Sequence, residues 1–185
     1  YNGKVETQVS NPALMGPELR NKYGDNFKYV VQSSWTGGHL LSVGDKHIAK
    51  VGTFFEPDAP DMLSLKMLKG TRAGLKDPYS IILSASAAES IFGKDDPINK
   101  VVKLDRNVDL KVTGVYEDLP DNTSFRDTKI MMPWELWLIQ NPWAKNMTEP
   151  WSSNFSQTFV QIADNTDMTK VSAAIKNAKL NNVSK

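Results

Sequence analysis

The stretch Ser80–Tyr116 constrains the fold of this chain more than any other segment. It opens with the apolar run Ile81–Leu83, which is typical of a strand covered on both faces. A serine then follows that can cap a helix start, either Ser84 or Ser86, and Ser86 with Glu89 fits a capping box. The pattern therefore predicts a buried strand that leads directly into a helix.

Local signals predict that this helix is short. Ala88, Ile91 and Phe92 fall on one helical face, so we expect this face to pack inward. Gly93 stands where a helix end often takes a positive φ, and Pro97 prevents the helix from resuming. A proline-marked turn is therefore expected to separate the helix from the strands that follow it.

Strand patterns recur through the middle of the chain. Residues 39–43 and 46–51 predict a hairpin around Gly44, because glycine tolerates the positive φ of such turns. Phe54 and Phe55 are expected to begin a proline-bearing loop. The other predicted strands span residues 27–35, 100–104, 108–116, 128–132 and 155–162.

Helix patterns lie near the two ends of the chain. Asn11 followed by Pro12 predicts the cap and first residue of a helix that ends at Gly24. Asp167 predicts the cap of an amphipathic helix near the end of the chain. Residues 61–69 are expected to form a short helix or a strand. Helices near both ends, with many strands between them, indicate an α+β fold.

Composition and charge exclude several classes of protein. The chain has 22 basic and 21 acidic residues and a net charge of +1, so no overall field draws it to nucleic acid. The absence of cysteine excludes disulfides, thiol nucleophiles and thiolate metal ligands. No apolar run approaches the roughly 20 residues that span a bilayer. Because the chain begins at Tyr1 rather than methionine, we expect a piece of a longer protein, and any membrane anchor could lie outside this piece.

A search for reactive groups assigns no catalytic, cofactor-binding or metal residue. His39 and His47 fall on neighbouring strands of the predicted hairpin, but no carboxylate pattern accompanies them, which favours solvated strand residues over a metal site. No serine lies in a GxSxG or SxxK motif, and Gly37–Gly38 is not followed by a phosphate-loop pattern. We therefore predict that the chain is not an enzyme.

Four of the five tryptophans lie between residues 134 and 151. Trp134 and Trp137 have helical spacing, which favours packing on a sheet over ligand binding. Trp143 and Trp151 lie in a segment rich in proline and asparagine, where we expect exposed rings. Exposed tryptophans can stack on sugars or hold a peptide, so these two residues are the candidate partner or ligand surface.

A longer pattern resembles a known family. The run ILSASAAESIFGKDDPINKVVKLD, followed by LKVTGVYEDLPDNTSF, is similar to the MacB-like periplasmic core domain of ABC-transporter permeases (MacB/FtsX-like), in a form typical of Bacteroidetes. Asn99 stands where the family has glycine, and asparagine also tolerates positive φ. The matching positions include Ser84, Phe92, Gly93, Pro97, Lys100, Gly114 and Pro120.

The resemblance implies a fold as well as a family. It implies one extracytoplasmic core domain over residues 1–185, built from two small subdomains of mixed sheet with short helices, one inserted into the other. We expect residues 1–60 and 130–185 to form the first, porter-like subdomain. Residues 60–130 are expected to form the inserted, strand-rich subdomain.

The resemblance also implies a function and a set of partners. Such a domain lies on the periplasmic side of the bacterial inner membrane and relays ATP-driven movement of transmembrane segments to export, including antimicrobial peptide export, or to signalling. Its expected partners are the transmembrane segments of the same permease, a cytoplasmic ATPase, a second permease copy and an envelope adaptor protein. The alternative is a free-standing envelope module that binds a glycan or peptide through Trp143 and Trp151.

Overall fold

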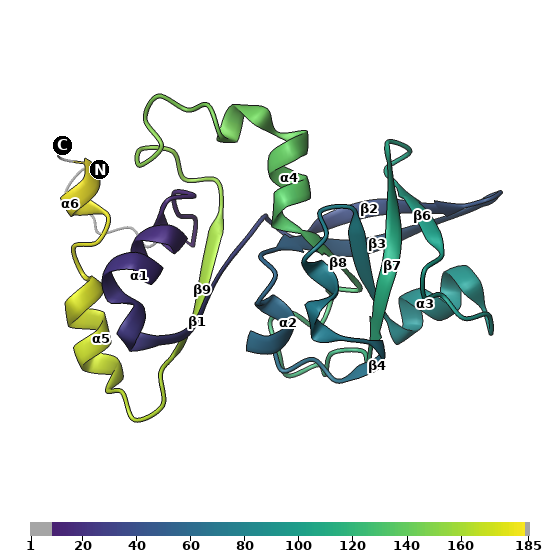
Figure 1. Cartoon of the computed structure of the whole chain (residues 1–185), viewed down its shortest axis with the longest axis horizontal. Coiled ribbons are helices and arrows are strands. Elements are labelled where there is room, and N and C mark those ends of the chain that lie inside the picture. Colours follow the sequence, from purple (N-terminus) through teal and green to yellow (C-terminus); the bar gives the residue numbers. More distant parts are fainter. Residues whose placement is uncertain (1–8, 184–185) are drawn as a thin grey trace. The chain divides into compact units, whose positions relative to one another are not determined.

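A computed structural model describes residues 9–183, which divide into two compact units (Figure 1). Unit 1 contains the residues up to Gln32 and those from Pro142 onward, and unit 2 is the continuous segment Ser33–Asn141. Unit 2 is therefore inserted into unit 1, and the chain crosses between them twice. The expected limits of the insertion, near residues 60 and 130, lie inside those of unit 2.

Unit 2 holds most of the strands (Figure 1). Its helices are short, and two of them are single 3₁₀ or α turns. Its elements are β2 Gly37–Val43, β3 Lys46–Phe55, α2 Ala59–Met62, β4 Met67–Gly70, the 3₁₀ helix η2 Arg72–Leu75, β5 Ser80–Ser84, α3 Ala85–Phe92, β6 Val101–Leu104, β7 Val108–Tyr116, β8 Ile130–Pro133 and α4 Trp134–Gln140.

Six strands of unit 2 pair in a closed ring. Strand β2 pairs with β3, β3 with β8, β8 with β5, β5 with β7, β7 with β6, and β6 again with β2. The β3–β8 and β5–β7 pairs are parallel and the others are antiparallel. Closure leaves few free edges, and β4 covers the last part of β7. The sheet is mixed, as the α+β prediction requires.

The centre of this ring is apolar and closed to solvent. All five residues of β5 are buried, and Ile81–Leu83 have no exposed surface, which confirms a strand covered on both faces. Phe55 is also fully buried. The predicted loop at Phe54–Phe55 is wrong, because β3 continues through these residues and pairs with β8. Their apolar rings supply core volume that a solvated loop does not need.

In the chain order of unit 1, helices come before and after the two strands that pair with each other. Its elements are α1 Met15–Tyr23, the 3₁₀ helix η1 Gly24–Asn26, most of β1 Phe27–Ser33, the 3₁₀ helix η3 Pro142–Ala144, β9 Gln157–Ile162, α5 Met168–Ile175 and α6 Leu180–Val183. β1 is hydrogen-bonded to β9. The small core gathers Leu19, Val30 and Ala178, with Met15, Tyr23, Phe27 and Ile175 packed against them.

The predicted hairpin and most of the predicted strands are present. Gly44 adopts φ +54 between β2 and β3, and Asp167 caps α5 by accepting from the Thr169 N–H at 2.7 Å. The predicted Asn11 cap is wrong. Helix α1 begins at Met15, and Asn11 instead pairs with Ser156 in an isolated β-bridge.

Candidate functional site

The family-like stretch is organised around the start of helix α3. Ser84, the last residue of β5, is extended (φ −68°, ψ 160°), and its Oγ accepts a hydrogen bond from the Ala87 N–H at 3.2 Å. Ser84 is therefore the helix cap. The capping box of Ser86 with Glu89 does not form, because the Ser86 N–H and hydroxyl both donate to Asp118. These contacts tie the helix to a distant part of the sequence.

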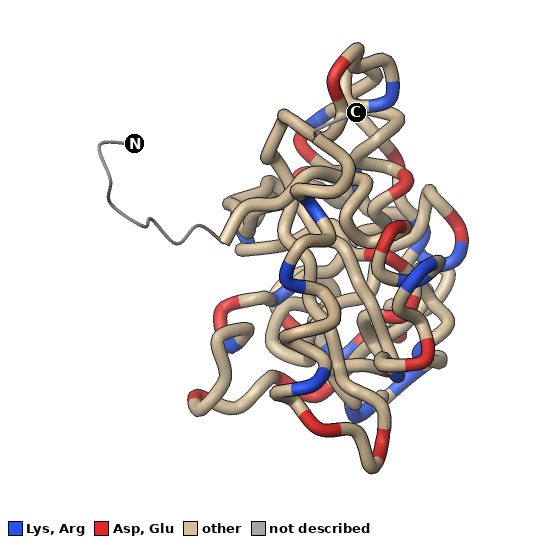
Figure 2. The backbone as a smooth tube through the Cα atoms, turned by 90° about the vertical axis from the view of Figure 1, so that its left-hand side faces the viewer, with Lys and Arg blue, Asp and Glu red and all other residues tan. Residues whose placement is uncertain are grey.

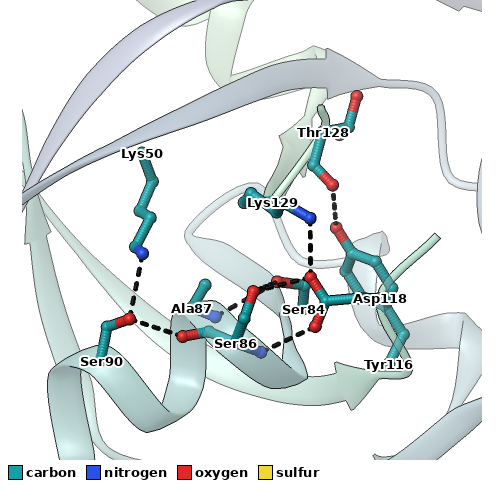
Figure 3. Close-up of polar contacts among 9 residues, drawn as sticks. All are labelled: Lys50, Ser84, Ser86, Ala87, Ser90, Tyr116, Asp118, Thr128 and Lys129. Carbon is teal, nitrogen blue, oxygen red and sulfur yellow. Dashed lines mark hydrogen bonds and ion pairs between the residues drawn. The ribbon is translucent and has the colours of Figure 1, made fainter. Parts of the chain in front are cut away.

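Asp118 is the centre of the polar contacts in Figure 3. Its carboxylate accepts from the Ser86 N–H at 2.8 Å, from the Ser86 hydroxyl at 2.6 Å and from Lys129 Nζ at 2.8 Å. The backbone repeats the connection, since the Ser84 N–H donates to the Lys129 carbonyl at 2.8 Å. The first turn of α3 is thus joined to the segment after β7 and to the residue before β8.

The ionisation of Asp118 follows from these contacts. Partial burial by itself raises the pKa of its carboxyl group, but Lys129 and the two Ser86 donors stabilise the charged form and prevail, which lowers the pKa to about 2. The carboxylate is therefore charged at neutral pH. It acts as an acceptor that holds three donors in place.

Tyr116 makes a second buried connection in the same region. Its side chain is fully buried at the end of β7, and its hydroxyl donates to the Thr128 carbonyl at 2.8 Å (Figure 3). Burial raises the pKa of the Tyr116 hydroxyl, and the neighbouring Asp118 charge raises it further. The hydroxyl therefore remains protonated and serves as a fixed donor that ties β7 to the approach to β8.

Two lysines of β3 donate hydrogen bonds to residues in the second half of α3. Lys50 Nζ donates to the Ser90 hydroxyl at 3.0 Å, and this hydroxyl donates to the Ser86 carbonyl at 2.6 Å. Lys46 Nζ donates to the Ile91 carbonyl at 3.1 Å. A cation near the last carbonyls of a helix also interacts favourably with the helix dipole. Helix α3 is therefore anchored near both of its ends.

The turn after α3 depends on backbone conformation. Gly93 has φ +62°, and its N–H closes the helix by donating to the Glu89 carbonyl at 2.8 Å. Asn99 has φ +64°, so asparagine does adopt the positive φ expected where the family has glycine. Pro97 between them is buried. These residues shape the turn, and their side chains make no arrangement of reactive groups.

Charged residues surround this turn in pairs. Lys100 Nζ lies 3.0 Å from the Asp95 carboxylate and 5.2 Å from the centre of the Phe92 ring. Lys69 Nζ donates to Asp96 at 2.9 Å, and this bond is the main cause that lowers the pKa of Asp96. Both pairs are exposed, so each contributes little to stability.

Gly114 and Gly70 let strands β4 and β7 approach closely. A Cβ at Gly114 would lie 2.7 Å from Met67 Cε and 3.2 Å from Ile82 Cγ2. Gly70 has φ +68°, and a Cβ there would overlap the Thr113 carbonyl oxygen. Any larger residue at either position must displace its neighbours. The family-like glycine at 114 is thus explained by packing.

The four clustered tryptophans fall into different environments. Trp134 is buried on α4 and stacks on Trp137 with the ring centres 4.7 Å apart and the planes 4° from parallel. Trp143 is 50% exposed, and its ring centre lies 5.0 Å from that of Phe155 in an edge-to-face arrangement. Trp151 is half-buried and lines a hollow of about 380 Å³. The structure therefore gives the two candidate ligand tryptophans different surroundings.

The two histidines make separate contacts. His39 Nδ1 lies 2.8 Å from the Asp105 carboxylate, and His47 Nδ1 lies 2.8 Å from the Ser42 hydroxyl. In the hairpin register His39 faces Lys50, and His47 faces Ser42, so the histidines are not paired. Across residues 9–183 no group of three or more His, Cys, Asp or Glu side chains is arranged to hold a metal ion.

Sequence reasoning missed the residues at the centre of the network. In the sequence, Asp118 belongs to a proline-marked turn that ends at Pro120, which is exposed, and nothing else distinguishes it. No sequence pattern singles out Lys129. Lys46 and Lys50 looked like ordinary charges on the hairpin. The one available signal was an acidic residue two positions after Tyr116, at the end of a strand that faces the start of a helix. Its partners are distant in sequence and meet only in the folded chain.

Charge is mixed over the molecule. Lys and Arg positions are interspersed with Asp and Glu positions along the tube in Figure 2, and the net charge is +1. Among the described residues, no helix combines the length and the apolar character needed to cross a bilayer.

The fold defines an α+β domain in which one unit is inserted into the other, and comparison with known proteins identifies the family. The chain belongs to the MacB-like periplasmic core domain family, whose model matches residues 5–178. It is therefore related to the periplasmic domains of MacB-like ABC-transporter permeases. None of the curated proteins matches it.

Three solved structures share the fold. A domain of a permease protein from Porphyromonas gingivalis is 18% identical, with a TM-score of 0.72 over 96% of this chain and 72% of that one. The periplasmic region of MacB from Actinobacillus actinomycetemcomitans is 17% identical (TM-score 0.69; 93% and 76% covered). The extracellular domain of the ABC-type transporter YknZ from Gram-positive bacteria is 16% identical (TM-score 0.66; 95% and 87% covered).

Proposed function

We propose that this chain is a non-enzymatic periplasmic domain that couples ATP-driven movement of the transmembrane segments of its permease to export or signalling. Family membership supports the setting, because MacB-like domains belong to ABC-transporter permeases. The expected partners are the transmembrane segments of the same permease, a cytoplasmic ATPase, a second permease copy and an envelope adaptor. Export of antimicrobial peptides is one activity that such a domain can serve.

The observation that carries the proposal is that polar side chains of unit 2 hydrogen-bond its elements to one another. Backbone pairing closes the six-strand ring, and the side chains of Asp118 and Lys129 join the segments that flank β7 and β8 to helix α3. A domain that transmits displacement has to be stiff, because a soft element absorbs movement without passing it on. The chain also enters and leaves unit 2 through two connections to unit 1, so movement of one unit acts on the other at both.

The test measures displacement directly. Because these 185 residues contain no cysteine, a single introduced cysteine can carry a spin label specifically within the domain. Asp121→Cys places a label on an exposed turn of unit 2, and Asp164→Cys places one on an exposed turn of unit 1. In the assembled permease and ATPase, with other cysteines removed, we expect the label-to-label distances between permease copies to change between nucleotide-free and ATP-bound states.

The two labels also separate the possible outcomes. Changes at both positions support movement of the whole domain, and a change at one position assigns the movement to that unit. Distances that stay the same at both positions while the ATPase hydrolyses ATP would contradict the proposed coupling. A native gene that encodes no transmembrane helix beside this domain would contradict it as well.

A further inference from the structure

The hollow beside Trp151 differs from the rest of unit 1 in chemistry. It is lined by Thr148–Ser152 together with Asn182 and Val183, and it has a volume of about 380 Å³. This volume is at the lower end of the roughly 300–1,000 Å³ of small-molecule pockets. The lining combines one indole ring with a carboxylate, an amide and two hydroxyls. The hollow is therefore neither an apolar groove nor a charged patch.

Three polar side chains around this hollow are not used by the fold. Within residues 9–183, the carboxylate of Glu149 and the hydroxyls of Thr148 and Ser152 form no hydrogen bond or ion pair. The Trp151 ring makes no ring contact with another described aromatic side chain. Trp143 is the contrast, because its ring already packs against Phe155. The groups at the hollow remain available to a ligand.

Asn182 is held so that one of its atoms stays available. Its Nδ2 donates to the Glu18 carboxylate at 2.8 Å and to the Ala178 carbonyl at 2.8 Å. Glu18 is itself fixed by Lys22, whose Nζ lies 2.7 Å away. Both amide hydrogens are therefore used within unit 1, and the Oδ1 of Asn182 remains as an acceptor. Such a prearranged acceptor reduces the entropy cost of binding.

We propose that this hollow binds a single sugar ring of a glycan. A half-buried indole presents an apolar face to the C–H groups of a sugar and a polar N–H at its edge. Carboxylate and amide oxygens accept from sugar hydroxyls, and the threonine and serine hydroxyls can both donate and accept. A ligand with several hydroxyls can hydrogen-bond to several of these groups at once, which favours polyhydroxylated ligands.

A cationic peptide fits the hollow less well. A lysine or arginine side chain would meet one carboxylate, that of Glu149, and this group is exposed to solvent. An exposed ion pair contributes only about 0–1 kcal/mol. The other lining groups are neutral and numerous, which suits hydroxyls better than one cation. The proposed sugar binding does not depend on the coupling role of the domain, so either proposal can fail without the other.

The test follows indole N–H signals by NMR in the 185-residue chain. The five tryptophans give five signals, which Trp→Phe variants assign. The probes are N,N′-diacetylchitobiose and cellobiose, with trilysine as the peptide probe. We expect a saturable shift of the Trp151 signal with at least one disaccharide and no comparable shift of the Trp143 signal.

Two variants and a matched control test the site residues. Isothermal titration calorimetry, which does not depend on the Trp151 signal, measures their affinities. Trp151→Ala should weaken binding at least tenfold, and Glu149→Gln, a surface change that leaves the core untouched, should weaken it severalfold. Trp143→Ala should leave the affinity within twofold. No saturable shift with either disaccharide would overturn the proposal, as would equal loss in Trp143→Ala and Trp151→Ala. Binding of trilysine without binding of either disaccharide would overturn it as well.

Discussion

The surroundings of α3 in unit 2 and the hollow beside Trp151 in unit 1 contain similar kinds of side chains but use them differently. Around α3, the carboxylate of Asp118 holds three donors, and Ser84 caps the helix start. At the hollow, the carboxylate of Glu149 and its neighbouring hydroxyls bind nothing within the described chain. Polar groups that are paired internally stabilise a fold, and groups left unpaired at a concave surface are suited to a ligand.

This difference assigns separate tasks to the two regions. Substitutions around α3 and its strands should lower stability, because each either strains the backbone or removes a hydrogen-bond partner. Substitutions at the hollow should leave stability nearly unchanged and affect binding. Measurements of both quantities on matched variants can therefore support or break the comparison.

The largest effect is expected at Gly70, beside β7. Gly70→Ala should lower the free energy of unfolding by about 3 kcal/mol, because it combines a strained positive φ with an overlap on the Thr113 carbonyl. Gly93→Ala, also at positive φ but facing open space, should cost only about 1–2 kcal/mol. Urea unfolding measures both. Equal losses would show that backbone strain alone governs this region.

A smaller loss is expected when the Tyr116 hydroxyl is removed. Tyr116→Phe keeps the buried ring but leaves the Thr128 carbonyl without its donor, which should cost about 1–2 kcal/mol. Tyr79→Phe removes the hydroxyl of a tyrosine that is 48% exposed and serves as the control. Thermal unfolding should therefore separate the two variants by several degrees. Similar melting temperatures would contradict a structural role for the Tyr116 hydroxyl.

The Asp118 network adds a pH dependence. The folded pKa of Asp118, about 2, is below its ordinary value of 3.8, so its charge stabilises the fold above pH 4 and this stability is lost as the pH falls toward 2. Asp118→Asn should therefore cost about 1–2 kcal/mol at pH 6, with solvent screening included, and much less near pH 2. Unfolding measured across this range gives the difference.

The matched control for Asp118 is its neighbour. Glu117 forms an exposed ion pair with Lys66 at 2.7 Å, so Glu117→Gln should change stability by less than about 0.5 kcal/mol at either pH. A difference between wild type and Asp118→Asn that does not shrink on acidification would show that the Asp118 charge is not what holds the helix start.

The smallest effects test the comparison itself. Lys50→Ala removes the donor to Ser90 and should cost about 0.5 kcal/mol, since the contact is near the surface. Glu149→Gln, at the hollow, should change stability by no more than about 0.3 kcal/mol. Replicate chemical denaturation experiments resolve this difference in the free energy of unfolding. A clear loss in Glu149→Gln would mean that the hollow contributes to the fold after all.

Local sequence signals predicted what neighbouring residues determine. The buried strand at Ile81–Leu83 follows from its apolar run, and the hairpin turn at Gly44 follows from a backbone preference. The positive φ of Asn99 has the same origin. The predictions failed where a distant partner decided the outcome. Asn11 was expected to cap a helix, but its backbone pairs with that of Ser156 in a β-bridge instead.

The sequence by itself thus determined the α+β class, the short helix α3 and the family, because each depends on residues close together in the chain. Only the tertiary structure decided that six strands close in a ring and that Asp118 meets Ser86 and Lys129. It also decided that Trp143 packs on Phe155 while Trp151 borders a hollow. The physical reason is that side chains far apart in sequence compete for the same partners, and packing selects the pairs.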